Sequence, residues 1–154
     1  MRRFAGLMGL VLLAAAVAGA QDRPPATEAD REAIAATALD YAEGCYEGNA
    51  ARMERALHPE LAKRIVRNDT QTSRSVLDQM GASVLVNIIA RGGCKNTPKE
   101  QQLKDVTIFD VYGNAATVKV VMAGWTDYLH IAKFNGRWVI VNVLWETKPQ
   151  PPKP

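Results

Sequence analysis

The stretch DYLHIAKFNGRWVIVNVLWE, residues 127–146, decides the fold. Two runs rich in β-branched and aromatic residues lie on either side of Asn135-Gly136. An Asn-Gly pair between two such runs is a strong short-range signal for a β-hairpin. A two-residue turn also fixes the register, so that Phe134 opposes Arg137 and every later pair follows from that one. The sequence therefore predicts two antiparallel strands joined by a tight turn.

Both faces of this predicted hairpin carry large apolar residues. Residues that oppose each other across the hairpin share a face. One face then holds Asp127, Leu129, Ile131, Trp138, Ile140, Asn142 and Leu144, and the other holds Tyr128, His130, Ala132, Val139, Val141, Val143 and Trp145. A sheet covered by helices on one side needs only one apolar face. We therefore expect the Trp138 face to pack on helices and the other face to meet a second copy of the chain in a symmetric dimer.

Three helices are predicted before this hairpin. Thr27 followed by Asp30 is typical of a capping box, and apolar residues from Ile34 to Cys45 then recur at helical spacing. Asn49 caps a second, shorter helix over 50–57, which ends before His58-Pro59. Residues 82–91 form a third helix that ends at Gly92-Gly93.

The remaining segments favour strands. Residues 61–80 are ambiguous, and we favour a short extended hairpin with its turn near Asn68-Asp69. Residues 105–125 hold two β-rich runs around Gly113-Asn114, which predicts another hairpin. Three N-terminal helices followed by an antiparallel meander of at least four strands indicate an α+β fold.

The N-terminal segment has the layout of a secretory signal peptide. Arg2 and Arg3 precede an apolar run, and Ala18-Gly19-Ala20 provides small residues at a cleavage site. The apolar run is shorter than the roughly 20 residues that a membrane-spanning helix needs, although an uncleaved anchor is the alternative. We expect a signal peptide at 1–20, a disordered tail at 21–26, one domain at 27–147 and a Pro-rich tail at 148–154. The protein would then be exported, to the periplasm or the medium, and have no membrane contact after cleavage.

Charge and motifs exclude several function classes. Without Arg2 and Arg3, the 19 Lys and Arg residues become 17, against 16 Asp and Glu residues. No basic patch stands out, so nucleic acid is not an expected partner. The chain lacks HExxH, GxSxG, P-loop and dinucleotide-binding motifs. Its two histidines lie far apart in sequence, so we expect neither a metal site nor a cofactor.

Cys45 and Cys94 are the two cysteines of the chain. Export would place them where disulfides persist, and a bridge would close a loop of about 50 residues. Two buried free thiols would fit the same spacing. The sequence slightly favours the disulfide.

Three separated blocks resemble a known family. Residues 38–64, residues 110–120 and the hairpin at 127–146 are together similar to the NTF2-like (SnoaL-like) superfamily, in its branch named putative lumazine-binding. The resemblance covers nearly all of residues 27–147. It implies a cone in which helices pack into a curved sheet, with a pocket at the open end and often a dimer across the back of the sheet. It also implies isomerases, hydratases and cyclases among the members, together with non-catalytic binding proteins.

Six residues are candidates for lining such a pocket: Tyr41, His58, Trp125, Asp127, Trp138 and Asn142. Enzymes of this fold tend to use a pocket Asp or His as a base, which makes Asp127 the candidate catalytic residue. Each polar candidate also has a structural interpretation: an exposed strand start for Asp127, a backbone partner for Asn142, a helix end for His58 and simple packing for Tyr41. His130 fits a packed histidine in the dimer interface better than it fits a base.

Three functions fit these observations. The first is an exported protein that binds a small, largely apolar molecule without catalysis. The second is a proton-transfer enzyme of the isomerase or dehydratase type, with Asp127 as the base and with Tyr41 or Asn142 stabilising an oxyanion. The third is a dimeric interaction module without a ligand. The homodimer would form through the face that holds His130, Val139, Val141 and Val143.

Overall fold

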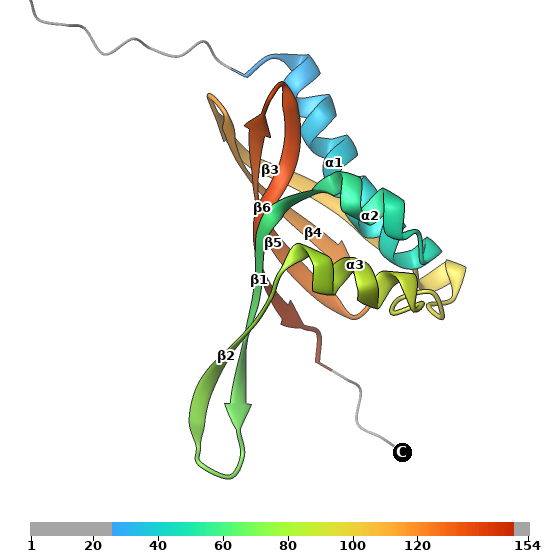
Figure 1. The fold of residues 1–154 in the computed structure, drawn as a ribbon, viewed down its shortest axis with the longest axis vertical. Helices are drawn as coiled ribbons and strands as arrows, with labels where there is room; N and C mark the ends of the chain where they lie inside the picture. The colour runs from blue at the N-terminus through green and yellow to red at the C-terminus, as the bar shows by residue number, and fades with distance from the viewer. Residues whose placement is uncertain (1–25, 150–154) are drawn as a thin grey trace, which may run out of the picture.

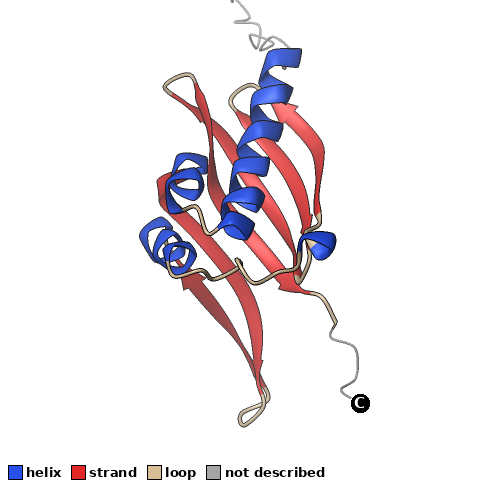
Figure 2. Ribbon diagram, turned by 90° about the vertical axis from the view of Figure 1, so that its right-hand side faces the viewer, coloured by secondary structure: helices blue, strands red, loops and turns tan. Residues whose placement is uncertain are grey.

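Six strands form one curved sheet, and the helices pack on one of its faces (Figures 1 and 2). The computed structural model describes residues 26–149, so the predicted signal peptide and most of both predicted tails lie outside the described residues. The elements in chain order are α1 (Glu28–Glu47), α2 (Ala50–Ala56), β1 (Leu57–Asp69), β2 (Arg74–Met80), α3 (Ala82–Ala90), the short 3₁₀ helix η1 (Lys99–Gln101), β3 (Lys104–Tyr112), β4 (Ala115–Met122), β5 (Trp125–Phe134) and β6 (Arg137–Thr147). The strand order across the sheet is β2-β1-β6-β5-β4-β3. The α+β class predicted from the sequence is therefore correct.

The order of elements differs from the prediction in one respect. Only α1 and α2 precede the first strand, and α3 follows the β1–β2 hairpin. The hairpin expected within residues 61–80 is present, but β1 already begins at Leu57 and the turn lies at residues 70–73. The far half of this hairpin extends away from the helices (Figure 1).

The sheet is mixed rather than wholly antiparallel. β1 runs parallel to β6, with Leu57 beside Ile140 and Lys63 beside Val143. The other neighbouring pairs are antiparallel. The turn signals in the sequence predict pairs of consecutive strands, whereas this parallel pair joins segments about 80 residues apart. The long-range pair places β1 next to the hairpin that defines the fold.

A β-bulge in β6 corrects the predicted faces of that hairpin. The pairs from Phe134–Arg137 to Ile131–Ile140 match the prediction, but beyond the bulge His130 pairs with Asn142 and Asp127 pairs with Trp145. One extra residue in a strand moves every later side chain to the other face. Val143 and Trp145 therefore face the helices, and Asn142 and Leu144 face outward, which reverses the predicted face of all four. Val143 is fully buried, whereas Leu144 is 49% exposed.

Helix α1 covers the inner face of the sheet through Ile34, Ala38, Tyr41, Ala42 and Cys45, all of which are buried. Its first turn has the predicted capping box, in which Thr27 and Asp30 bond to each other's backbone N–H groups. Asp30 also accepts hydrogen bonds from Lys133 (2.8 Å) and from the indole of Trp138 (3.0 Å). These donors, together with Thr27, hold the pKa of Asp30 well below its usual range. The cap therefore attaches the start of α1 to the β5–β6 hairpin.

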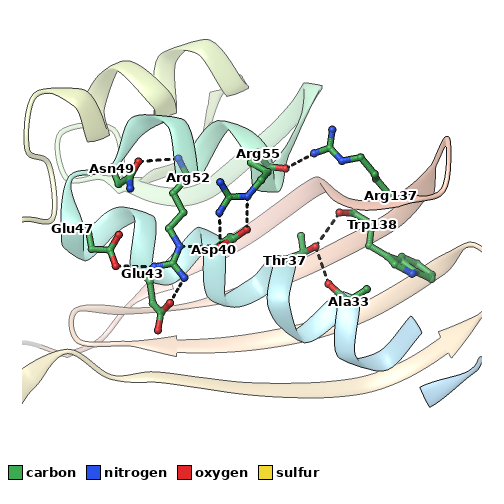
Figure 3. Close-up of polar contacts among 10 residues, drawn as sticks. All are labelled: Ala33, Thr37, Asp40, Glu43, Glu47, Asn49, Arg52, Arg55, Arg137 and Trp138. Atoms are coloured by element: carbon green, nitrogen blue, oxygen red, sulfur yellow. Dashed lines mark hydrogen bonds and ion pairs between the residues drawn. The ribbon is translucent and has the colours of Figure 1, made fainter. Parts of the chain in front are cut away.

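Arg52 of α2 connects this helix to α1 through ion pairs (Figure 3). Its guanidinium group donates to Asp40 (2.8 Å) and Glu47 (2.7 Å) and also forms an ion pair with Glu43. Burial raises the pKa of Asp40, but Arg55 and Arg52 together outweigh it, so that the pKa of this carboxyl is lowered. Lys104 and Arg52 likewise lower the pKa of Glu43 against the effect of burial. At Gly44, an added Cβ would lie only 3.0 Å from the backbone nitrogen of Met53. The close approach of α1 and α2 thus leaves little room for a side chain at this position.

Cys45 and Cys94 form a disulfide that joins the end of α1 to the loop after α3, with a Cα–Cα distance of 5.2 Å. This bond confirms the pairing that the sequence slightly favoured. It links two segments that are 49 residues apart.

Among the helices of residues 26–149, none combines the length and the apolar character needed to cross a membrane.

Removal of this disulfide is expected to destabilise the protein. The Cys45→Ala/Cys94→Ala variant should lose about 2–4 kcal/mol of unfolding free energy, because the unfolded chain is then no longer constrained by the cross-link. Urea denaturation of the variant and of reduced wild-type protein would measure the loss, and the two should agree. Labelling of two free thiols in unreduced, unfolded wild-type protein would contradict the bond.

Candidate functional site

Three polar side chains from distant parts of the chain meet inside the apolar core. Tyr41 comes from the sheet-facing side of α1, Lys63 from the inner face of β1, and Asp127 from the inner face of β5. Their exposed fractions are 3%, 5% and 0%. A buried lysine and a buried aspartate are rare in proteins unless they are paired. This cluster is therefore the first candidate for a functional site.

The three groups are hydrogen-bonded in a triangle. Lys63 Nζ donates to Asp127 Oδ1 (2.6 Å) and to the Tyr41 hydroxyl (2.7 Å). The Tyr41 hydroxyl in turn donates to Asp127 Oδ1 (3.0 Å). Lys63 Nζ also lies 4.6 Å from the centre of the Trp145 ring, which is within cation–π distance. A lysine ammonium has three N–H donors, so one remains for a further acceptor.

Burial sets the protonation properties of this cluster. It raises the pKa of Asp127, although the Lys63 ammonium group opposes the effect. It lowers the pKa of Lys63, again against the attraction of Asp127. Asp127 Oδ2 is buried and has no hydrogen-bond partner among the described residues, which adds to the cost of the ionised carboxylate. Both shifts bring the charged pair closer in energy to the neutral amine and carboxylic acid.

An apolar pocket of about 230 Å³ opens beside this cluster. Its walls come from all three α-helices, both strands of the β1–β2 hairpin and the ends of β5 and β6, and they consist of Tyr41, Cys45, Met53, Lys63, Arg67, Met80, Leu85, Ile88, Ile89, Gly93, Cys94, Trp125 and Trp145. The Lys63 amine and the Tyr41 hydroxyl are buried polar groups of this lining. Asp127 does not line the pocket and lies behind them, so that it can affect a ligand only through Lys63 or Tyr41.

Trp125 and Trp145 lie edge to face in the pocket wall, with their ring centres 6.3 Å apart. The Arg67 guanidinium lies 5.9 Å from the centre of the Trp145 ring. Two cations therefore lie near the Trp145 ring: Lys63 in the core and Arg67 at the surface. The Trp145 indole N–H is buried and has no partner among the described residues, so it is a further polar group of the pocket lining, beside the Lys63 amine and the Tyr41 hydroxyl.

Three of the six predicted pocket residues belong to this region. Tyr41 and Trp125 line the pocket, and Asp127 is in contact with Tyr41. The other three lie outside this pocket. His58 stacks on Phe134 near the β5–β6 turn, with ring centres 4.4 Å apart, and Trp138 bonds to Asp30 at the opposite end of α1 from Cys45. Asn142 is on the outer face because of the bulge, and there it accepts a hydrogen bond from Arg64.

Sequence reasoning missed Lys63 and Trp145. The sequence places Trp145 on the outer face only if the register set by the tight turn continues along the whole hairpin without a bulge. Lys63 lies between Leu61 and Ile65, and the three residues are buried on one face of β1. The sequence signal for Lys63 is a lysine at an inward position between two apolar residues of an alternating strand. This signal can be read only if residues 57–69 are first recognised as a strand.

In residues 26–149, no group of three His, Cys, Asp or Glu side chains is arranged to hold a metal ion.

A second, wider hollow of about 710 Å³ lies between α2 and α3 and reaches Arg137. Its charged residues, Glu54, Arg55 and Arg137, are exposed, so that their charges are screened by solvent. The smaller pocket has fewer but buried polar groups, which interact more strongly with a ligand. We therefore regard the smaller pocket as the candidate site.

The Lys63–Asp127 pair is expected to depend on both partners. Lys63→Met should lower the unfolding free energy by about 3–5 kcal/mol at pH 7, because it leaves a buried carboxylate without its counter-charge. The Lys63→Met/Asp127→Leu variant should recover part of this loss. Urea denaturation measures both, and Lys104→Met, which removes an exposed ion pair with Glu43, is the control with a small effect.

The loss in Lys63→Met should also shrink as the pH falls from 7 to 5. Asp127 would have a folded-state pKa above its unfolded value, so the folded state binds the extra proton and gains stability relative to the unfolded state at lower pH. An equal loss at both pH values would show that Asp127 is not a buried charge.

Comparisons with known proteins agree with this architecture. The sequence profile of the family described as "Putative lumazine-binding" matches residues 29–146. Similar solved structures include an NTF2-like protein of unknown function from Shewanella baltica OS155, with 21% identity, a TM-score of 0.59 and coverage of 81% of this chain and 99% of that chain. Another comes from Methylobacillus flagellatus KT, with 18% identity, a TM-score of 0.58 and coverage of 80% and 96%.

A protein of unknown function with a cystatin-like fold from Nostoc punctiforme is also similar, with 15% identity, a TM-score of 0.57 and coverage of 84% and 98%. At these identities the structures establish the fold alone. A comparison with curated proteins gave no match. Because the family profile covers most of the sequence, the chain belongs to the putative lumazine-binding family, and its fold is NTF2-like.

Proposed function

We propose that this protein binds a small, largely apolar molecule with one polar end, in the pocket above Lys63 and Tyr41. The observation that carries the proposal is an apolar pocket whose lining holds a buried amine and a buried phenol, both fixed by a carboxylate, together with the buried indole N–H of Trp145. A pocket of about 230 Å³ is below the usual range for drug-sized ligands, which favours a small molecule.

The lining suggests how such a molecule would be oriented. Met53, Met80, Leu85 and Ile89 supply apolar contacts for a hydrocarbon portion. The third N–H of the Lys63 ammonium group can donate to an oxygen atom at the other end of the molecule. Because Lys63 is buried and held in place by Asp127 and Tyr41, this hydrogen bond would be stronger than one at the surface.

A proton-transfer enzyme is the second candidate, and the bond between Tyr41 and Asp127 favours it. Asp127 lies behind the pocket wall, so in this mechanism Tyr41 or Lys63 would carry the proton between Asp127 and the substrate. The binding function needs no such relay. We therefore rank non-catalytic binding first.

We also propose that the protein is exported and forms a homodimer through the outer face of the sheet. The disulfide is compatible with export. The outer face exposes Phe109, Tyr112, Tyr128 and Leu144, with Lys119 and Asp110 of opposite charge nearby, which suits a self-complementary twofold contact. Of the four residues predicted for this interface, the proposed contact keeps the exposed His130 and the partly exposed Val141, whereas Val139 and Val143 are buried within the chain.

Binding can be tested with 1-hexanol and hexanoate as probes. Each should change the tryptophan fluorescence in a saturable way, because Trp125 and Trp145 lie in the pocket wall. Leu85→Phe should weaken binding about tenfold or more by filling the pocket, whereas Val84→Phe on the exposed side of the same helix should not. The proposal fails if neither probe gives saturable binding and native mass spectrometry of the purified protein finds no bound small molecule.

The dimer can be tested by sedimentation. Wild-type protein should sediment as a dimer, and Val141→Glu should convert it to a monomer, because a charge would be buried in the apolar interface. Val66→Glu, at an exposed position of the β1–β2 hairpin, is the control and should remain a dimer. A monomeric wild-type protein, or a dimeric Val141→Glu variant, would be evidence against this interface.

A further inference from the structure

We propose that Lys63 captures a small aldehyde or ketone in the pocket by forming a Schiff base through its Nζ atom. This inference rests on the proposed binding function and names the chemical class of the ligand. It uses three observations: the amine lines an apolar pocket, a carboxylate is in direct contact with the amine, and a phenol bridges the two.

Among the lysines that the structure describes, Lys63 is the best placed to act as a nucleophile. An amine attacks a carbonyl group only in its neutral form, which requires a nearby proton acceptor. Asp127 Oδ1 lies 2.6 Å from Nζ, and burial favours the neutral forms of both groups. In contrast, Lys104 and Lys133 are half-exposed and pair with carboxylates near the surface, where water stabilises the ammonium group.

The reaction balances without an oxidant or a reductant. The Lys63 ammonium group transfers one proton to Asp127, and the free amine then attacks the carbonyl carbon, forming the C–N bond and moving the π electrons to oxygen. Tyr41 can donate its proton to this oxygen and receive the proton from Asp127. A second proton moves from nitrogen to oxygen, and the C–O bond breaks. An ammonium group and a carbonyl compound thus become a protonated imine and one water molecule.

The pocket also suits the product. A protonated imine keeps the positive charge of Lys63, so it retains the ion pair with Asp127. It also retains the cation–π contact with the Trp145 ring. The apolar walls accept the hydrocarbon portion and limit the access of water that would hydrolyse the imine. A buried ion pair often stabilises a protein no more than packed apolar residues of the same volume do. Stability alone therefore does not explain why a lysine lines this pocket.

The test is reductive trapping with hexanal and sodium cyanoborohydride. Peptide mapping by mass spectrometry should find a hexyl group on Lys63 at a rate about tenfold or more above that on Lys104 of the same molecules. Lys104 is an internal control, so the test does not depend on a variant that folds. 1-Hexanol should protect Lys63 and not Lys104, and Tyr41→Phe should slow the labelling of Lys63 about tenfold or more.

Each outcome separates the two proposals. If hexanal or 1-hexanol changes the tryptophan fluorescence in a saturable way but Lys63 is not labelled faster than Lys104, imine formation is wrong and the binding function stands. If neither compound binds and Lys63 is not labelled, both proposals fail. Preferential labelling of Lys63 that 1-hexanol blocks would support both.

Discussion

The buried contact between Lys63 and Asp127 is the constraint on which the rest of the structure depends. Moving either charge out of water is costly, so each is tolerated only because the other lies within hydrogen-bond distance. The contact also requires β1, β5 and α1 to converge, since Tyr41 completes the triangle. The fold must therefore bring these three elements together, and the pocket lies where they meet.

The β-bulge in β6 has consequences on both sides of the sheet. Without it, Trp145 would face outward, and Lys63 would lose the aromatic ring that lies 4.6 Å from its ammonium group. The same bulge turns Asn142 outward, next to His130 and Arg64. One inserted residue thus places an aromatic ring in the pocket wall and a polar network on the opposite face.

The disulfide belongs to the pocket as well as to the framework. Cys45 and Cys94 both line the pocket, so the covalent bond is part of its wall. It holds the loop after α3 against the end of α1. Such a bond can keep a small pocket preformed, which lowers the entropic cost of binding.

The sequence by itself determined the helix caps at Thr27 and Asn49, the Asn135-Gly136 turn, the α+β class and Tyr41 on the inner face of α1, because these depend on residues close together in the chain. It also indicated Asp127 as an unusual polar residue on an apolar face. Only the tertiary structure decided the partner of Asp127, the parallel β1–β6 pair and the outward turn of Asn142. The physical reason is that a bulge and a pair of distant strands leave no periodic pattern in the sequence, while the cost of a buried charge is offset only by a group that the fold brings from 64 residues away.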